Sequence, residues 1–132
     1  MNILALDIGD KRIGIAISES GVIASELTTI ENNREAMPFL KDLIAQRKIE
    51  KLVVGLPLLA SGDESLQAKK VKGFMVEFLE HNPIPMVYED EHLTSKEAER
   101  LLKESNLTGK QIADRVDQMS AKIILEQYLS HQ

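Results

Sequence analysis

Two apolar runs near the N-terminus, joined by a short charged turn, constrain the fold more than any other part of the chain. Residues 3–6 have strand character and are followed by a single acid, Asp7, and by Gly9. The polar triplet Asp10-Lys11-Arg12 then leads into a second apolar run over residues 13–17. Two such runs separated by a short glycine-containing turn predict a β-hairpin. Because the apolar residues run on without clean alternation, we expect the hairpin to be buried.

Asp7 needs a physical explanation, because an acid in a buried strand costs free energy unless it is hydrogen-bonded, paired or bound to a cation. Lys11 and Arg12 stand in the turn that follows it. Asp7 is therefore interpreted either as an acid that caps or pairs locally at the end of a strand, or as part of a functional site.

Composition sets the class of protein. The chain has 132 residues, of which 43% are hydrophobic and 28% charged, and this predicts one compact globular domain over residues 1–132. The absence of cysteine excludes thiol catalysis, thiolate metal sites and disulfides. The net charge of −5 argues against a general polyanion binder, but it is compatible with a nuclease whose clustered carboxylates hold divalent metal ions.

No segment of the sequence predicts a membrane or secretory protein. The longest apolar stretch, residues 52–60, is too short to span a bilayer and contains Pro57. The N-terminus shows no basic region that leads into an apolar segment and a cleavage site. We therefore expect a cytoplasmic protein without a membrane partner.

The remaining elements follow in an order that predicts an α/β fold. A mixed-polarity run over residues 25–30 predicts an edge strand, and Asn32-Asn33 offers a helix N-cap. Capping boxes are expected at residues 61–64, 94–97 and 108–111. The predicted helices run to Lys48, over about 65–81, over 94–104 and from 108 to about 129; two further strands cover residues 50–55 and 86–91. This order predicts a mixed five-stranded sheet flanked by helices, its first three strands antiparallel and its two further strands parallel.

Three acids are expected to meet at one edge of this sheet. The carboxyl ends of parallel strands share an edge, so Asp7 is expected near the strand that ends in Glu89-Asp90-Glu91, without a choice among these three. In the last helix Asp117 shares an apolar stripe with Ala121 and Ile124, although taken alone it is expected to pair with Arg115, Lys122 or another solvated charge. Together, three such acids suit one or two Mg²⁺ or Mn²⁺ ions, because hard cations prefer oxygen ligands.

These features resemble the YqgF/RuvX family of RNase H-like proteins, which are described as Holliday-junction-resolvase-like and as pre-16S rRNA nucleases. The similarity covers essentially the whole chain. Its strongest part is residues 6–18, which are close to the family's Asp-x-Gly-x-Lys-Arg-Ile-Gly-x-Ala-x-Ser pattern. Three weaker blocks follow in order: Gly55-Leu-Pro57 with Gln67-Ala68, Asp90-Glu91 with Leu93-Thr94, and Asp117 with Ala121 and Ile124-Leu125.

The resemblance implies an RNase H-like nuclease domain whose acidic triad falls on Asp7, Glu91 and Asp117, as catalytic residues and metal ligands. It thereby selects Glu91 from the three strand-end acids. The chain departs from the family pattern at His92, where Arg is usual, and at Ser61, where Asp commonly precedes the glycine. A further departure, Asp10, stands in a turn position that is more often neutral. The first two departures put substrate contacts at those positions in doubt, but none removes a metal ligand.

The expected activity is metal-dependent phosphodiester hydrolysis, with Mg²⁺ or Mn²⁺ held by the triad. The expected substrate contacts are Lys11, Arg12, Gln67 and Lys70, the last two from a 58–70 segment that closes over the strand. The implied reaction is processing of the 5′ end of precursor 16S rRNA. One alternative is a Holliday junction resolvase acting on branched DNA as a homodimer. A second is a non-catalytic RNA- or ribosome-associated binding protein, and the sequence does not decide between RNA and DNA.

Overall fold

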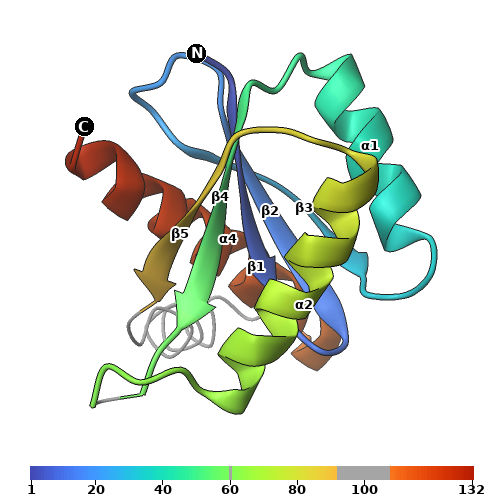
Figure 1. Cartoon of the computed structure of the whole chain (residues 1–132), viewed down its shortest axis with the longest axis vertical. Coiled ribbons are helices and arrows are strands. Elements are labelled where there is room, and N and C mark those ends of the chain that lie inside the picture. Colours follow the sequence, from blue (N-terminus) through green and yellow to red (C-terminus); the bar gives the residue numbers. More distant parts are fainter. Residues whose placement is uncertain (60, 92–107) are drawn as a thin grey trace.

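The computed structural model describes residues 1–59, 61–91 and 108–132. Its centre is a five-stranded sheet in the order β3-β2-β1-β4-β5 (Figure 1). The helix expected over residues 94–104 and the departure at His92 lie outside the described residues. The strands are β1 (Ile3–Ile8), β2 (Arg12–Ser18), β3 (Ser25–Glu31), β4 (Lys51–Pro57) and β5 (Met86–Glu91).

The pairing of the strands is the one that the sequence predicts. β1 pairs antiparallel with β2, and β2 pairs antiparallel with β3, which lies at the edge of the sheet. β4 pairs parallel with β1, and β5 pairs parallel with β4. β4 is longer than expected, because it continues beyond Gly55 to Pro57, which pairs with Glu91 at the end of β5. The carboxyl ends of β1, β4 and β5 therefore lie along one edge.

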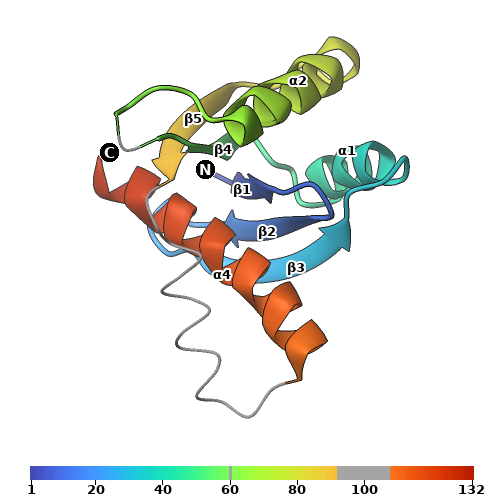
Figure 2. The ribbon, with the colours of Figure 1, turned by 90° about the horizontal axis from the view of Figure 1, so that it is seen from below.

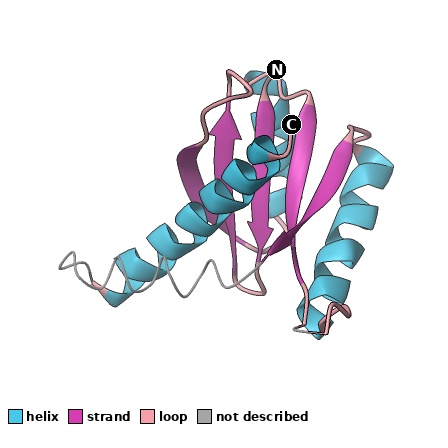
Figure 3. Ribbon diagram, turned by 90° about the vertical axis from the view of Figure 1, so that its left-hand side faces the viewer, coloured by secondary structure: helices cyan, strands magenta, loops and turns pink. Residues whose placement is uncertain are grey.

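Helices cover both faces of the sheet. α1 (Ala36–Gln46) and α2 (Leu66–His81) lie on one face, and α4 (Gly109–Ser130) crosses the other face diagonally (Figures 2 and 3). Within the described ranges, no helix combines the length and the apolar character that are needed to cross a membrane.

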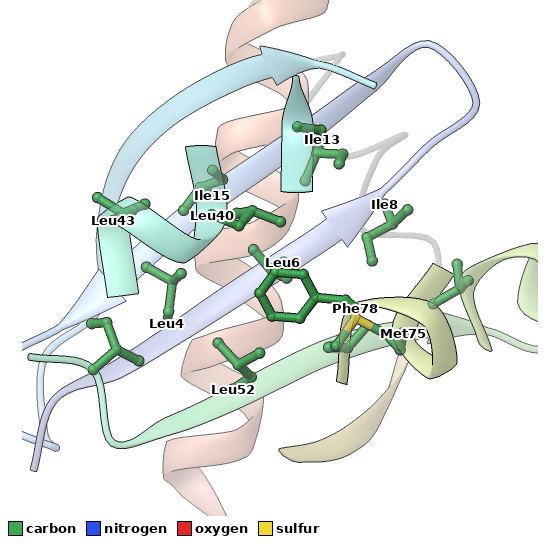
Figure 4. Packing of buried hydrophobic residues seen from close by; sticks show 14 of the residues in the cluster. Leu4, Leu6, Ile8, Ile13, Ile15, Leu40, Leu43, Leu52, Met75 and Phe78 are labelled. Carbon is green, nitrogen blue, oxygen red and sulfur yellow. The ribbon is translucent and has the colours of Figure 1, made fainter. Parts of the chain in front are cut away.

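Alternate residues of the central strands build two separate cores. Leu4, Leu6 and Ile8 of β1 belong to a larger core with side chains of α1 and α2, including Leu40, Met75 and Phe78 (Figure 4). Ile3 and Ala5 belong to a smaller core with side chains of α4. Because side chains alternate along a strand, the residue that follows Ala5 on the α4 face is Asp7.

Two of the expected helix N-caps are wrong, because nearby polar residues make turns instead, although α2 begins at Leu66, close to the expected start at about residue 65. The N-cap of α1 is Glu35, and the Oδ1 atom of Asn33 accepts a hydrogen bond from the Glu35 N–H. The N-cap of α2 is Ser65, whose hydroxyl accepts from the Ala68 N–H, so no capping box starts at Ser61. Residues 61–64 instead form a turn in which Gly62 has a φ of +88°.

The third described start is confirmed. Thr108 and Gln111 form a reciprocal capping box at the N-terminus of α4, in which each side chain bonds to the other residue's backbone N–H. Pro38 lies in the first turn of α1, where the missing N–H of proline leaves no intrahelical bond unmade.

Candidate active site

Glu91 reaches Asp7 across the intervening strand β4. The register pairs Leu6 with Val54, so Asp7 and Gly55 follow directly after a matched pair. A Cβ atom added to Gly55 would lie 3.3 Å from Oε2 of Glu91 and 2.4 Å from Cδ1 of Ile124. The glycine therefore leaves the space that the Glu91 carboxylate needs. A side-chain hydrogen bond joins the carboxyl groups of Asp7 and Glu91.

Asp117 is delivered by α4 from the other side of β1. Gly14 of β2 pairs directly with Asp7, and a Cβ atom at Gly14 would lie only 1.9 Å from the backbone oxygen of Asp117. The helix backbone can rest on β2 only because this residue has no side chain. The buried stripe that continues from Asp117 consists of Ser120, Ala121, Ile124, Leu125 and Tyr128. This confirms the expectation that Asp117 shares an apolar face directed at the sheet.

The charges at this edge are poorly compensated. Burial raises the pKa of Asp7 well above its ordinary value of 3.8, and the neighbouring carboxylates of Glu91 and Asp117 raise it further. The hydrogen bond with Glu91 acts in the same direction, because the protonated Asp7 carboxyl donates it to the Glu91 carboxylate. Burial also raises the pKa of Asp117, although hydrogen bonding and attraction by Arg12 oppose this shift. Asp7 therefore takes up a proton more readily than an isolated aspartic acid does.

Asp117 forms an ion pair with an arginine from a distant part of the chain. The Nε atom of Arg12, the first residue of β2, donates to Oδ2 of Asp117 at 2.7 Å. Arg115, which was one expected partner of Asp117, contacts Glu26 of β3 at 3.1 Å instead. Arg12 is thus both a predicted substrate contact and the counter-ion of a predicted metal ligand.

The oxygen atoms of the three acids are of the type that hard divalent cations prefer as ligands. Asp7, Glu91 and Asp117 offer only carboxylate oxygens, and the raised pKa of Asp7 reflects a need for positive charge at this position. The three acids do not, however, form a complete metal cage. Within the described part of the chain, no group of three or more His, Asp and Glu side chains is arranged to hold a metal ion. The Asp7 and Glu91 carboxyl groups bond to each other, whereas the Asp117 carboxylate bonds to Arg12.

The other predicted substrate residues surround the turn between β1 and β2. Gln67 of α2 donates from Nε2 to the carbonyl oxygen of Ile8 at 3.0 Å. Lys70 contacts the carboxylate of Asp10 at 3.2 Å. Lys11 is exposed, and with Arg12 it lines a groove of about 690 Å³ between this turn, β3 and the start of α4. The structure therefore gathers all four residues around one turn, with Gln67 and Lys70 bonded to it.

Some residues that shape the site were given no role there by the sequence analysis, which offered Asn32 only as a helix N-cap and Gly55 only as part of a family motif. Asn32 holds the turn, because its side chain donates to the Gly9 carbonyl at 2.7 Å and its backbone N–H donates to the Lys11 carbonyl. Gly14 and Gly55 make room for α4 and for Glu91. The sequence signal for these two is glycine inside a strand, which often marks a close approach of another group.

Comparisons of the chain with known proteins give consistent matches over nearly its full length. Residues 1–131 match the RuvX family, which is described as "Holliday junction resolvase". A protein of Sulfurihydrogenibium sp. (strain YO3AOP1), named "Putative pre-16S rRNA nuclease", is 41% identical over 96% of this chain and 88% of that protein. A protein of the same name from Thermoanaerobacter pseudethanolicus is 37% identical over 100% and 98% of the two chains.

The fold has a counterpart among solved structures. Thermus thermophilus RuvC in complex with a Holliday junction substrate aligns with a TM-score of 0.59, covering 99% of this chain and 94% of that one. At 11% identity this likeness concerns the fold alone, which is RNase H-like. The match to the family spans nearly every residue, and the relatives align over almost their full length, so the chain belongs to the RuvX family.

Proposed function

We propose that this protein is a metal-dependent endonuclease that hydrolyses phosphodiester bonds in nucleic acid, as a single domain in the cytoplasm. The observation that carries the proposal is the hydrogen-bonded pair of Asp7 and Glu91 at the carboxyl edge of the sheet, with Asp117 close enough to raise the pKa of Asp7. Three acids gathered at one place are costly for folding alone. Their chemistry suits phosphoryl chemistry with a divalent cation.

Each residue of the site has a proposed role. Asp7 is the central ligand of Mg²⁺ or Mn²⁺, because it lies between the other two acids, and Glu91 and Asp117 complete the ligand set. When bound, the cation would activate a water molecule for attack and stabilise charge on the leaving oxygen. Lys11 and Arg12 contact phosphate groups of the substrate. Gln67 and Lys70, which bond to the turn, hold that turn in position.

The substrate that we favour is the 5′ end of precursor 16S rRNA. The relatives that share about two fifths of their residues with this chain bear the name "Putative pre-16S rRNA nuclease", and they align over almost their whole length. The solved resolvase is much more distant in sequence. RNA is therefore the better supported nucleic acid.

Two alternatives each rest on a specific observation. The family description and the fold shared with RuvC favour cleavage of Holliday junctions, which requires a two-fold dimer because two sites must cut one junction. The ion pair between Asp117 and Arg12 favours a non-catalytic RNA-binding protein, since it leaves the acids without a complete metal cage among the described residues.

A cleavage experiment separates these functions. Purified protein is incubated with a labelled structured RNA that carries a single-stranded 5′ extension and, separately, with a labelled four-way DNA junction. Each substrate is tested with Mg²⁺, with Mn²⁺ and with EDTA. The proposal predicts metal-dependent cutting of the RNA and loss of cutting in an Asp7→Asn variant.

Asp90 supplies a matched control. It is exposed, and it stands between Glu89 and Glu91 on a strand whose side chains alternate, so it points away from the α4 face. Asp90→Asn is therefore expected to cut normally. Cutting of the junction alone would replace the favoured substrate with the first alternative. RNA binding without cutting under every metal condition, unchanged in Asp7→Asn, would overturn the nuclease proposal and support the second.

A further inference from the structure

The ion pair between Arg12 and Asp117 joins two residues that the proposed mechanism uses separately. Arg12 begins β2 beside the turn, and Asp117 lies in α4, 105 positions further along the chain. The Nε to Oδ2 distance is 2.7 Å, and the side chains are 36% and 21% exposed. Both groups are thus partly shielded from solvent, and water competes less with the pair than it does at an open surface.

This ion pair conflicts with a full ligand role for Asp117. Asp7 and Glu91 are hydrogen-bonded to each other, whereas the carboxylate of Asp117 is directed at a guanidinium. Among the described residues no three acids are arranged to share one ion. Oδ2 of Asp117 is occupied by Arg12, so a cation bound at that oxygen would have to displace the guanidinium.

If Arg12 left Asp117, its guanidinium could bind a ligand in the neighbouring groove. Its side chain lines the groove of about 690 Å³ that also holds Lys11 of the turn, Asn32 beside β3 and Lys110 at the start of α4. Three acids, Asp10, Glu31 and Asp114, line the groove as well, so a phosphate would have to bind at the donors and away from these carboxylates. Lysine, arginine and asparagine side chains donate hydrogen bonds to phosphate oxygens. Arg12 both lines this groove and binds Asp117, so its side chain connects the groove to one of the three acids.

We propose that Arg12 is a displaceable counter-ion, which pairs with the Asp117 carboxylate until a divalent cation binds there instead. The freed guanidinium then binds a phosphate of the nucleic-acid strand in the groove. Cation binding and strand binding thereby reinforce each other through one side chain. This inference rests on the proposed function, because it assumes that Asp117 is a metal ligand.

A competing role for Arg12 makes the opposite prediction. Carboxylates that bind metals are commonly held in orientation by a second hydrogen-bonding group. If Arg12 did this through Oδ2 while Oδ1 bound the cation, removing Arg12 would weaken cation binding. If Arg12 is a displaceable counter-ion, removing it strengthens cation binding. The sign of the change therefore separates the two roles.

The test measures Mn²⁺ binding by calorimetry in the absence of nucleic acid. Compared with the unchanged protein, Arg12→Gln is expected to bind Mn²⁺ about three- to tenfold more tightly, since no ion pair must be broken. Arg12→Lys keeps the charge but loses the guanidinium fork, and its affinity is expected to lie between the two. The matched control is Arg115→Gln, which removes the same charge from the helix of Asp117 but contacts Glu26, and it is expected to change Mn²⁺ affinity little.

A second measurement follows Arg12 directly. The ¹⁵N–¹H resonance of the Arg12 Nε group, assigned by its absence in Arg12→Lys, is expected to shift when Mg²⁺ is added, because this N–H donates to Asp117. An unchanged resonance under saturating Mg²⁺ would overturn the displacement.

The failures of the two proposals are distinguishable. Unchanged or weaker Mn²⁺ binding in Arg12→Gln would overturn the counter-ion role and leave the metal site intact. No Mn²⁺ binding by the unchanged protein or by Arg12→Gln would overturn both proposals, because the acids would then not be a metal site.

Discussion

Asp7 binds more protons in the folded protein than in the unfolded chain, because burial and the carboxylates of Glu91 and Asp117 raise its pKa above 3.8. Between that value and the raised pKa, the stability of the folded state therefore falls as pH rises. Each unit of difference is worth about 1.4 kcal/mol, or about 3–6 °C in Tm for a chain of this size. We predict that Asp7→Asn raises the Tm near neutral pH and changes it little near pH 4, measured in EDTA.

Two further melts check the cause. Asp90→Asn removes an exposed acid from the neighbouring strand, and its Tm difference is expected to stay small at every pH. Added Mg²⁺ is expected to narrow the gap between the unchanged protein and Asp7→Asn, since a cation bound to the folded state stabilises it. A Tm difference between Asp7→Asn and the unchanged protein that is the same at acid and neutral pH would contradict the view that ionisation of Asp7 destabilises the folded state.

Residues differ in how far the sequence alone identifies them. Side chains alternate along β5, and Val87 packs in the core under α4, so Glu89 and Glu91 share that face whereas Asp90 does not. Alternation alone would have removed Asp90 from the three candidates. Position on the strand then separates the other two, because Glu89 contacts His131 at the far end of α4. No such local rule indicates the pairing of Arg12 with Asp117, which depends on how α4 lies across the sheet.

At the scale of elements, the start of α2 shows how local competition moves a boundary. Ser61 and Ser65 both suit an N-cap by residue type, but Gly62 has a positive φ and its N–H bonds to the Leu59 carbonyl, so Ser61 and Gly62 belong to a turn that precedes the helix. Hydrophobic periodicity correctly predicted the existence and type of each described helix. It did not predict which of two serines ends the turn, since both satisfy the same chemistry.

Substitution of the two serines tests this assignment. The Ser65 hydroxyl accepts from the Ala68 N–H and donates to the Pro57 carbonyl at 2.6 Å, so Ser65→Ala is expected to lower the free energy of unfolding by about 1–2 kcal/mol. Ser61→Ala removes only exposed contacts to Asp63 and is expected to cost less than about 0.5 kcal/mol. Urea denaturation of both variants measures the difference. Equal losses would argue against Ser65 as the cap.

The packing of α4 on β2 makes a stronger prediction. In Gly14→Ala the new methyl group would lie 1.9 Å from a helix carbonyl oxygen, which cannot move without shifting the helix. We expect a loss of at least about 3 kcal/mol in unfolding free energy, and a displaced Asp117. Gly73 is an exposed helical glycine with nothing near its added methyl, so Gly73→Ala is expected to gain about 0.5–1 kcal/mol. Near-normal stability of Gly14→Ala in urea denaturation would mean that α4 does not rest on β2 as described.

At the scale of the whole molecule, the two ends of α4 border two different grooves. Its N-terminal end borders the groove with Lys11, Arg12 and Lys110, and its C-terminal end borders a second groove with Val22, Ile23 and Lys122. The net charge of −5 gives no general attraction for nucleic acid. Binding of a nucleic-acid strand would therefore depend on the Lys and Arg side chains close to the acids. The element order predicted the sheet that creates this edge, but the groove joins segments about 80 residues apart that only the folded chain brings together.

If the groove beside the acids holds a nucleic-acid strand, its lysines should contribute to the salt dependence of binding. Each phosphate contact with a single strand contributes about −0.7 to the slope of log K against log salt concentration. Lys11→Gln and Lys110→Gln are each expected to reduce that slope by about 0.7 and to weaken binding equally for RNAs of unrelated sequence, because phosphate contacts do not read bases. Fluorescence anisotropy in EDTA measures this without cleavage. Lys122→Gln, the same change in the other groove, is expected to leave the slope unchanged. An equal loss in all three variants would mean that the strand does not follow the groove next to Arg12.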